Sequence, residues 1–365
     1  MRATVDAKEF SLALDRVSKV VKRSSVLILQ GIKVQISDGR CTLTATDLTT
    51  WLTAEIPAQG DNLSFVLQRT KAATRACRYF DGELFLELTE TGSDQDRRLW
   101  LAMSCGVRAA KFEVDLTEDF PAAGTGELLR SFTANAERLL ERVEHVKYSL
   151  KKPDFQTRAS QSHVQFSAND IYALDGYRMA WDNDPALRFP MPFMVLPEAL
   201  EYLRFFGNKE VSLAFRSQYL QITDGSFTIE SHFEMMGMFN LDSAIPGEPL
   251  ETFFVSPREF LRELDYLKRF IPVIGKPYVY FSSGKLSMLV AGENYSTAVS
   301  IDGESKINFG FELQYMIDAL RQFGTEQRIK VKVISPVAPI ILEADNRGDH
   351  AMVLPVRISE AVKAA

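Results

Sequence analysis

The chain has 365 residues, of which 46% are hydrophobic and 25% are charged. This composition is ordinary for a globular protein and excludes a disordered, collagen-like or disulfide-scaffold chain, and the length favours two to three domains. Lysine and arginine number 42 against 48 aspartates and glutamates, a net charge of −6. Nucleic-acid binding through overall basic charge is thereby disfavoured, unless the positive charge gathers on one face.

The sequence shows no membrane-spanning segment, signal peptide or cysteine-based site. No apolar run approaches the roughly 20 residues that a transmembrane helix needs, and the first ten residues lack the apolar core of a signal peptide. The cysteines Cys41, Cys77 and Cys105 are too few and too scattered for a disulfide framework or a zinc site. We therefore expect a cytoplasmic protein with no membrane contact, metal or cofactor.

Three segments of the chain open alike. They start at Thr4, Thr133 and Phe254 and read TVDAKEFSLALDRV, TANAERLLERVEHV and FVSPREFLRELDYL, so the starts lie 129 and 121 residues apart. This spacing is too long for a solenoid repeat and matches the length of a small domain. The repeat predicts three homologous domains, with linkers in the proline- and glycine-rich segments 121–127 and 245–251.

Each copy begins with a predicted helix. Asp6, Asn135 and Ser256 are N-cap candidates, because their side-chain oxygens can accept hydrogen bonds from the first turn, and Pro257 suits the first helical position. In the first copy the helix is expected over 8–23. Its apolar stripe has helical spacing and consists of Phe10, Ala13, Leu14, Val17 and Val20.

Alternating strands and a second helix follow in each copy. Hairpins are expected around Asp38-Gly39 and Ser283-Gly284, where apolar and polar residues alternate on both sides of a turn pair. Second helices are expected over 68–80, 197–206 and 312–323, each followed by another alternating hairpin. The order of helix, strands, helix and strands predicts an α+β fold in which two helices of each domain pack on antiparallel sheets.

Positive charge concentrates on the predicted helices. The helix at 8–23 has five basic and two acidic residues, and the helix at 68–80 has four basic residues and no acid. The six helices together carry +6, which leaves −12 for the rest of the chain. Solvated helix faces carry charge in any protein, but the asymmetry in the first domain favours a basic face for a phosphate backbone.

Several ordered motifs give the chain a family likeness from Met1 to Ile358. They are DGRCTLTATDLTTWLTAEI at 38–56, EDFP at 118–121, ALDGYRMAW at 173–181, FGFELQYMIDAL at 309–320 and MVLPVRI at 352–358. Each motif is weak alone, but their order, spacing and threefold repeat are specific together. The sequence resembles the bacterial DNA polymerase III beta subunit, the beta sliding clamp, as a divergent member.

The resemblance implies an architecture and a function. It implies three tandem DNA-clamp domains over 1–123, 127–246 and 250–358, a C-terminal tail over 359–365, and two copies joined head to tail as a homodimeric ring. It also implies a processivity factor that encircles double-stranded DNA and tethers the replicative DNA polymerase and the clamp loader through short peptide motifs.

A peptide pocket between the second and third domains is implied by the same likeness. An apolar wall with few polar groups suits an apolar peptide anchor, although single members such as Met179, Val353 and Leu354 can equally be core residues. The implied lining is Leu174, Gly176, Tyr177, Arg178, Met179, Pro246, Tyr315, Val337, Val353, Leu354, Pro355, Val356 and Arg357.

The DNA-binding and dimer-interface residues are expected elsewhere. The likeness points to Arg23 at the end of the first helix and to the loop residues Lys151 and Lys152. The charge count adds Lys22, Arg69, Lys71, Arg75 and Arg78. For the dimer interface the likeness implies Lys111, Phe112 and Val114 on an edge strand, facing either segment 295–301 or Phe270 and Ile271.

The sequence also departs from the family. Segment 155–166 lacks the usual arginine-and-glycine motif, and Glu198 stands where clamps often have a lysine. Segment 237–240 lacks the proline and aromatic residue that usually follow it, and Glu312 replaces a common asparagine. Such differences fit a divergent clamp, for example a second copy or one from a mobile element.

Catalytic motifs are missing from the sequence. It has no nucleophile elbow, Walker loop, dinucleotide fingerprint or zinc-protease motif, and its four histidines are dispersed and interpreted as structural or surface residues. The acidic group Glu113, Asp115, Glu118 and Asp119 is interpreted as a solvated edge and loop. We expect a non-catalytic protein. The alternatives are a clamp-derived peptide-binding scaffold that does not encircle DNA and, much less favoured, a hydrolase that uses Asp115 and Asp119.

Overall fold

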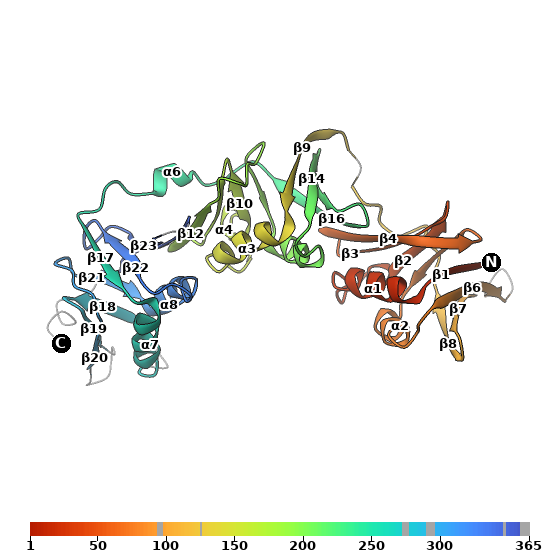
Figure 1. The fold of residues 1–365 in the computed structure, drawn as a ribbon, viewed down its shortest axis with the longest axis horizontal. Coiled ribbons are helices and arrows are strands. Elements are labelled where there is room, and N and C mark those ends of the chain that lie inside the picture. The colour runs from red at the N-terminus through yellow and green to blue at the C-terminus, as the bar shows by residue number, and fades with distance from the viewer. Residues whose placement is uncertain (93–97, 125, 272–276, 290–295, 346–347, 358–365) are drawn as a thin grey trace. The chain divides into compact units, whose positions relative to one another are not determined.

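The structure is a computed structural model that describes residues 1–92, 98–124, 126–271, 277–289, 296–345 and 348–357. The chain divides into two compact units (Figure 1). The first comprises 1–138 and 198–234, and the second comprises 139–197 and 235–365. Helices and antiparallel strands make up both units, which confirms the expected α+β class. No helix in the described residues has the length and apolar character needed to cross a bilayer.

The N-terminal part of the first unit packs two helices on antiparallel sheets. Strand β4 is central, because it pairs with β1, β3 and β16. The elements are β1 (Arg2–Asp6), α1 (Ala7–Val17), η1 (Leu27–Gln30), β2 (Ile32–Ser37), β3 (Arg40–Thr46), β4 (Thr50–Gly60), β5 (Leu63–Leu67), α2 (Thr70–Cys77), β6 (Glu83–Thr91), β7 (Arg98–Cys105) and β8 (Arg108–Val114).

The first unit also includes a meander of later strands. Strand β16 pairs with β4 from Phe227 opposite Ala54 to Ser231 opposite Thr50, so one sheet runs from early strands into late ones. The elements are β9 (Leu128–Asn135), η2 (Glu201–Phe205), β14 (Glu210–Arg216), β15 (Tyr219–Thr223) and β16 (Phe227–Glu234).

The second unit repeats this construction. Strand β12 pairs with β24 from Arg178 opposite Val353 to Asp182 opposite Asp349, and a separate four-stranded sheet has the order β20-β19-β18-β21. The elements are α4 (Ala159–Ser162), β10 (Val164–Ser167), β11 (Asp170–Leu174), β12 (Arg178–Asn183), β13 (Phe193–Val195), α6 (Leu241–Ala244), β17 (Glu251–Val255), α7 (Pro257–Lys268), β18 (Tyr278–Ser282), β19 (Lys285–Leu289), β20 (Ser296–Ser300), β21 (Phe309–Glu312), α8 (Leu313–Arg321), β22 (Ile329–Val333), β23 (Ile340–Ala344) and β24 (Asp349–Val353). Helices α3 (Ala136–Lys147) and α5 (Pro197–Leu200) cross the unit boundaries.

The predicted helix starts are confirmed. Asp6 accepts hydrogen bonds from the backbone N–H groups of Lys8 and Glu9, both at 2.9 Å. Asn135 and Ser256 accept from the third helical N–H at 3.0 and 3.4 Å. These bonds satisfy donors that the helix itself leaves without partners.

Helix lengths differ from the prediction. The first helix ends at Val17 rather than near residue 23, although the predicted stripe from Phe10 to Val20 is buried. The helix expected over 197–206 is one α-helical turn followed by the 3₁₀ segment η2. Burial of an apolar stripe needs only the side-chain spacing, so it does not require regular helix to the last residue.

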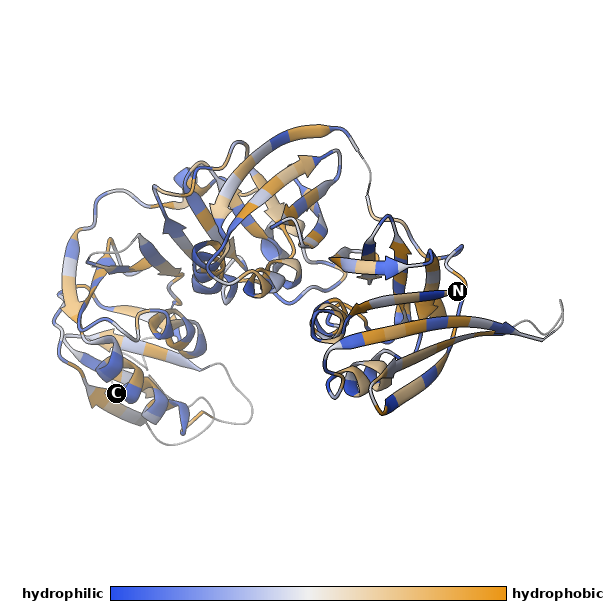
Figure 2. Cartoon of the chain, turned by 45° about the vertical axis from the view of Figure 1, so that its right-hand side comes forward, coloured by the Kyte–Doolittle hydropathy of each residue, from blue (hydrophilic) through white to orange (hydrophobic). Residues whose placement is uncertain are grey.

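The predicted hairpins are confirmed at both turn pairs. Asp38 and Gly39 have φ values of +54° and +75°, and Ser283 and Gly284 have +47° and +74°. Two consecutive positive φ values define the type I′ turn, whose twist matches that of the flanking strands. Hydrophobic and hydrophilic residues interleave along the strands (Figure 2). Val290, the last alternating residue of the hairpin expected around Ser283-Gly284, and segment 358–365 lie outside the described residues.

Candidate functional site

A tight turn between β11 and β12 forms one edge of the candidate peptide site. Gly176 has φ +95°, a conformation that a side chain would strain. The carboxylate of Asp175 accepts hydrogen bonds from the backbone N–H groups of Tyr177 and Arg178 at 2.8 and 3.0 Å. The turn is therefore held from within, and it presents Tyr177 to solvent with 63% of that residue exposed.

Arg178 extends from this turn into a nearly closed environment. Its side chain is 12% exposed and donates to Asp175 at 3.0 Å and to Asp318 at 2.7 Å. The guanidinium carbon lies 4.7 Å from the ring centre of Tyr315 and 5.6 Å from that of Tyr148. Planar guanidinium groups favour both paired carboxylates and stacked rings, so Arg178 fixes β12 against α8.

Helix α8 begins beside the same turn. Glu312 caps it by accepting a hydrogen bond from the Tyr315 N–H at 2.8 Å. Burial raises the pKa of Glu312, and the hydrogen bonds from the helix start oppose that rise. Tyr315 stacks on Tyr177 with ring centres 6.2 Å apart. The departure noted at Glu312 thus has a structural role, which is to place Tyr315 at the site.

Part of the expected wall is buried in an apolar cluster that includes a residue of the short helix α6. Leu174 and Met179 are only 7% and 3% exposed and belong to one apolar cluster with Leu241 of α6. The segment before α6 is anchored by two hydrogen bonds, from Tyr172 Oη to the Phe239 carbonyl at 2.9 Å and from the Phe239 N–H to Gln165 at 2.7 Å. Leu174 and Met179 are therefore covered by the side chains of this cluster.

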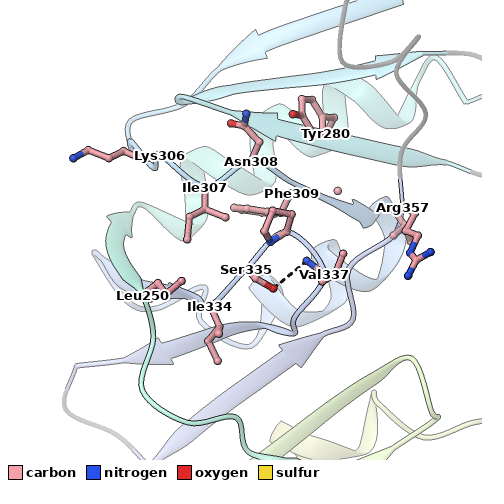
Figure 3. Close-up of a pocket in the computed structure, with 13 residues that line it drawn as sticks. Leu250, Tyr280, Lys306, Ile307, Asn308, Phe309, Ile334, Ser335, Val337 and Arg357 are labelled. Carbon is pink, nitrogen blue, oxygen red and sulfur yellow. Dashed lines mark hydrogen bonds between the residues drawn. The ribbon is translucent and has the colours of Figure 1, made fainter.

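The open part of the site is a cavity of about 680 Å³ (Figure 3). Val337, Val356 and Arg357 from the expected lining border it, and the Val356 N–H donates to the Gly310 carbonyl at 2.9 Å. Lys306 and Arg357 lie at opposite sides of the cavity in Figure 3. Further lining comes from Leu250, Tyr280, Ile307, Asn308, Phe309, Gly310, Ile334, Ser335 and Pro336.

The expected pocket residues therefore fall into three groups. Val353 has no exposed surface in this structure and lies behind the wall. Leu174 and Met179 are covered. The accessible residues, exposed or half-buried, are Gly176, Tyr177, Arg178, Pro246, Tyr315, Val337, Leu354, Pro355, Val356 and Arg357.

Sequence reasoning missed the cavity's other side. Tyr280 and Phe309 come from β18 and β21, which pair with Tyr280 opposite Gly310. The signal was present in the alternation of β18, where Val279 and Phe281 enter the core and Tyr280 between them faces the other way.

Ion pairing separates the predicted DNA-binding residues into two sets. Lys22 pairs with Asp47 at 2.6 Å, Arg78 with Asp15 at 3.1 Å, and Lys151 with Asp154 at 3.1 Å. Their charges are largely compensated. The other set is exposed and consists of Arg23, Arg69, Lys71, Arg75 and Lys152. Within the described residues, no carboxylate lies within 4 Å of the charged groups of this set.

A second basic surface lies on α7 and α8. A shallow groove of about 730 Å³ is bordered by Arg258, Arg262, Arg269 and Arg321, with Asp265 as the single lining acid. The net charge of each single helix did not indicate this basic surface, because acidic residues on the other faces of each helix cancel the arginines in the count.

The expected dimer residues lie on and near strand edges. Among the described strands, β8 pairs only with β7 and β20 only with β19. Phe112 is half-buried, Val114 is buried, and Lys111 lies over the Trp100 ring at 4.9 Å. Phe270 contacts the Tyr266 ring, and Ile271 packs on the core of the second unit. Residue 295, at the start of the alternative partner segment, lies outside the described residues.

The acidic group after β8 is exposed at all four positions, Glu113, Asp115, Glu118 and Asp119. This agrees with the interpretation of a solvated edge and loop.

The chain is similar over its whole length to known sliding clamps. The Beta sliding clamp of Pseudomonas putida KT2440 is 22% identical over 387 residues, covering 98% of this chain and all of the relative. A putative DNA polymerase III beta subunit from Eubacterium rectale matches 98% of this chain and 99% of its own, with a TM-score of 0.84 at 18% identity. A Pseudomonas aeruginosa sliding clamp bound to griselimycin matches 98% of this chain and all of its own, with a TM-score of 0.80 at 16% identity. No family model matches the chain.

Proposed function

This chain is a divergent relative of the bacterial β sliding clamps, and we propose that it is a processivity factor that encircles duplex DNA and tethers a DNA polymerase. The observation that carries the proposal is the likeness in fold over 98% of the chain, with a TM-score of 0.84. The role is non-catalytic, since holding a polymerase on DNA requires a closed ring and a binding pocket rather than reacting groups.

The chain is proposed to comprise three domains over 1–123, 127–246 and 250–358. The pairing of β4 with β16 joins strands of the first and second, and the pairing of β12 with β24 joins strands of the second and third. Both junctions continue a sheet across a domain boundary by antiparallel pairing.

Two copies are proposed to close the ring through the remaining edges. Strands β8 and β20 each have one pairing partner among the described strands. Free edges invite further strand pairing. Pairing β8 of one protomer with β20 of its partner would repeat the type of junction already present twice within the chain.

The DNA-facing surface is proposed to include the uncompensated cations of the first unit. These are Arg23, Arg69, Lys71 and Arg75, supplemented by Lys152 and by Arg258 and Arg269 of the arginine groove. They suit phosphate contacts, which carry no base specificity. The other two arginines of that groove contribute less, because Arg262 pairs with Glu263 and Arg321 with Asp318. Lys22, Arg78 and Lys151 contribute less, because each is already paired with an aspartate.

The partner site is proposed to run from the Tyr177 turn past Leu354 to the 680 Å³ cavity. It would accept short apolar peptides of a polymerase and a clamp loader. Fluorescence anisotropy with a labelled clamp-binding peptide tests this. The double variant Tyr177→Ala, Leu354→Ala is expected to bind at least tenfold more weakly, and equal affinity would remove the pocket assignment.

Retention on DNA of defined topology tests the function as a whole. The protein is loaded on nicked circular plasmid with a bacterial clamp loader and ATP, and free protein is removed by gel filtration. A closed ring is expected to stay on the circle and to leave once a restriction enzyme linearises it. Equal behaviour on both forms would contradict encirclement and leave the peptide-binding scaffold as the explanation.

A further inference from the structure

The cavity at the partner site combines apolar surface with charge of one sign. Two of its apolar lining residues, Leu250 and Val337, are 77% and 66% exposed. Its charged lining residues, Lys306 and Arg357, are both basic (Figure 3). The volume of about 680 Å³ lies within the range of about 300–1,000 Å³ that is typical of ligand pockets. The cavity therefore suits an apolar segment that carries a carboxylate.

The ammonium group of Lys306 is available for such a carboxylate. Lys306 is exposed, and within the described residues no carboxylate lies within 4 Å of its ammonium group. The carboxylate of Glu251 accepts hydrogen bonds from Ser305 Oγ at 2.7 Å and from the backbone N–H groups of Lys306 and Ile307 at 3.0 and 3.2 Å. Glu251 thus attracts the Lys306 side chain but forms no ion pair with it.

The described part of the chain ends at the rim of this cavity. The Leu354 N–H donates to the Tyr177 carbonyl and the Val356 N–H to the Gly310 carbonyl, both at 2.9 Å. These bonds fix the last described residues beside the site. Eight further residues, 358–365, follow Arg357 in the sequence and lie outside the described residues. Eight extended residues span up to about 26–29 Å, which is enough to cross a cavity of this volume.

The composition of segment 358–365 matches the lining of the cavity. The segment reads ISEAVKAA, so it offers the apolar residues Ile358 and Val362, three alanines and a single acid, Glu360. Glu360 stands between the two larger apolar residues and precedes the only basic residue of the segment, Lys363. Apolar side chains gain free energy by leaving water for an apolar wall, and the acid is complementary to Lys306.

We propose that segment 358–365 folds back into this cavity and competes there with partner peptides, an inference that rests on the proposed partner site. Ile358 and Val362 would lie against the apolar wall, and Glu360 near Lys306. A segment on a short tether acts at an effective concentration in the millimolar range, so even weak docking competes. The apparent affinity for a partner falls with the fraction of molecules whose cavity is open. The chain would thereby select for partner peptides that bind strongly.

Peptide binding tests the competition. Fluorescence anisotropy with a labelled clamp-binding peptide compares the full-length chain with a chain that ends at Ile358. The shortened chain is expected to bind at least fivefold more tightly. Glu360→Lys should bind like the shortened chain, and Lys363→Gln, the matched control in the same segment, should bind like the full-length chain. Equal affinity of the full-length and shortened chains would overturn the proposal and leave the partner site in place.

A direct measurement of docking separates this proposal from the proposed function. Val362→Cys is labelled with an environment-sensitive dye in the folded protein, because the three native cysteines are buried. Val337→Asp in the cavity is expected to shift the emission to the red, and so is excess clamp-binding peptide. Leu116→Asp, on an exposed residue of the other unit, is the control and should leave the emission unchanged.

Two outcomes of the dye measurement would overturn the proposal. One is emission that Val337→Asp leaves unchanged, because the segment then does not dock in the cavity. The other is emission that stays unchanged under a peptide that binds the shortened chain, because docking then does not compete. A red shift on Val337→Asp in a chain that binds no clamp-binding peptide in either length would support docking and contradict the partner site.

Discussion

Asp224 shows how one carboxylate organises a turn. It lies between β15 and β16 with its side chain 7% exposed. Burial raises its pKa, but the Lys209 ammonium at 2.7 Å and the backbone N–H groups of Phe227 and Ser226 outweigh burial and hold the pKa well below its usual range. The charged form therefore stabilises the fold.

The sign of this shift predicts an acid-dependent loss of stability. Because the folded pKa lies below the unfolded value of about 3.9, the stabilisation is complete above that pH and is lost as pH falls below it. Asp224→Asn is expected to lower the free energy of unfolding by about 1–3 kcal/mol at pH 7 and by a smaller amount at pH 3, where the loss of the stabilisation has begun, measured by urea denaturation. Asp38→Asn, in the β2–β3 turn, is the control. An equal loss from Asp224→Asn at both pH values would contradict this account.

Arg178 carries more stability than an ordinary surface arginine. Removing it would leave Asp175 and Asp318 without their shared cation, in a place where Asp175 is 9% and Asp318 23% exposed. Arg178→Met is expected to cost about 3–5 kcal/mol of unfolding free energy. Arg40 is the comparison, because its side chain is 72% exposed and pairs with Glu55 at the surface. Arg40→Met should cost less than about 1 kcal/mol of unfolding free energy. Similar losses in the two variants would show that the Arg178 network adds nothing beyond a surface pair.

At the scale of elements, α1 and α2 differ in what their charges do. Around α1, Lys8 pairs with Asp81, Lys19 with Asp15, and Arg16 lies over the Phe205 and Phe227 rings. The free cations of this surface are therefore mainly those of α2 and the residue before it. The sequence count treated both helices alike, because pairing depends on acids brought from other segments.

This difference predicts unequal effects on DNA association. Lys71→Gln with Arg75→Gln is expected to reduce the slope of log affinity against log salt by about two, since each residue lost removes roughly one phosphate contact. Lys22→Gln should change the slope much less, because Asp47 already compensates Lys22. Titration of duplex DNA at several salt concentrations measures the slopes. Equal slopes for the double variant and wild type would exclude α2 from the DNA-facing surface.

At the scale of the whole molecule, the proposed ring requires a dimer through β8. Light scattering is expected to give about twice 41.1 kDa at micromolar protein. Phe112→Asp places a charge on the proposed interface strand and should give the monomer mass with an unchanged circular dichroism spectrum. Leu116→Asp is the control, because Leu116 is 45% exposed just beyond the strand. A wild-type monomer at both micromolar and nanomolar concentration would contradict closure by this chain alone.

Local features were predictable from the sequence because they depend on neighbours in the chain. The N-caps at Asp6, Asn135 and Ser256, the I′ turns, and the alternation of β2 and β3 follow from hydrogen bonds and side-chain periods within a few residues. The family resemblance extended the prediction from local elements to the whole fold, since the order of several weak motifs reflects the whole architecture. These levels needed no knowledge of distant contacts.

The amino-acid sequence by itself determined the α+β class, the threefold opening motif and the predominance of basic residues on the first two helices. Only the tertiary structure decided which cations remain free, that Leu174 and Met179 are buried in one apolar cluster, and that Val353 is internal. It also decided that Val356 and Gly310 meet at the cavity, although they are far apart in sequence. The physical reason is that burial and charge compensation are set by strand register and helix packing between distant segments, and no local pattern records them.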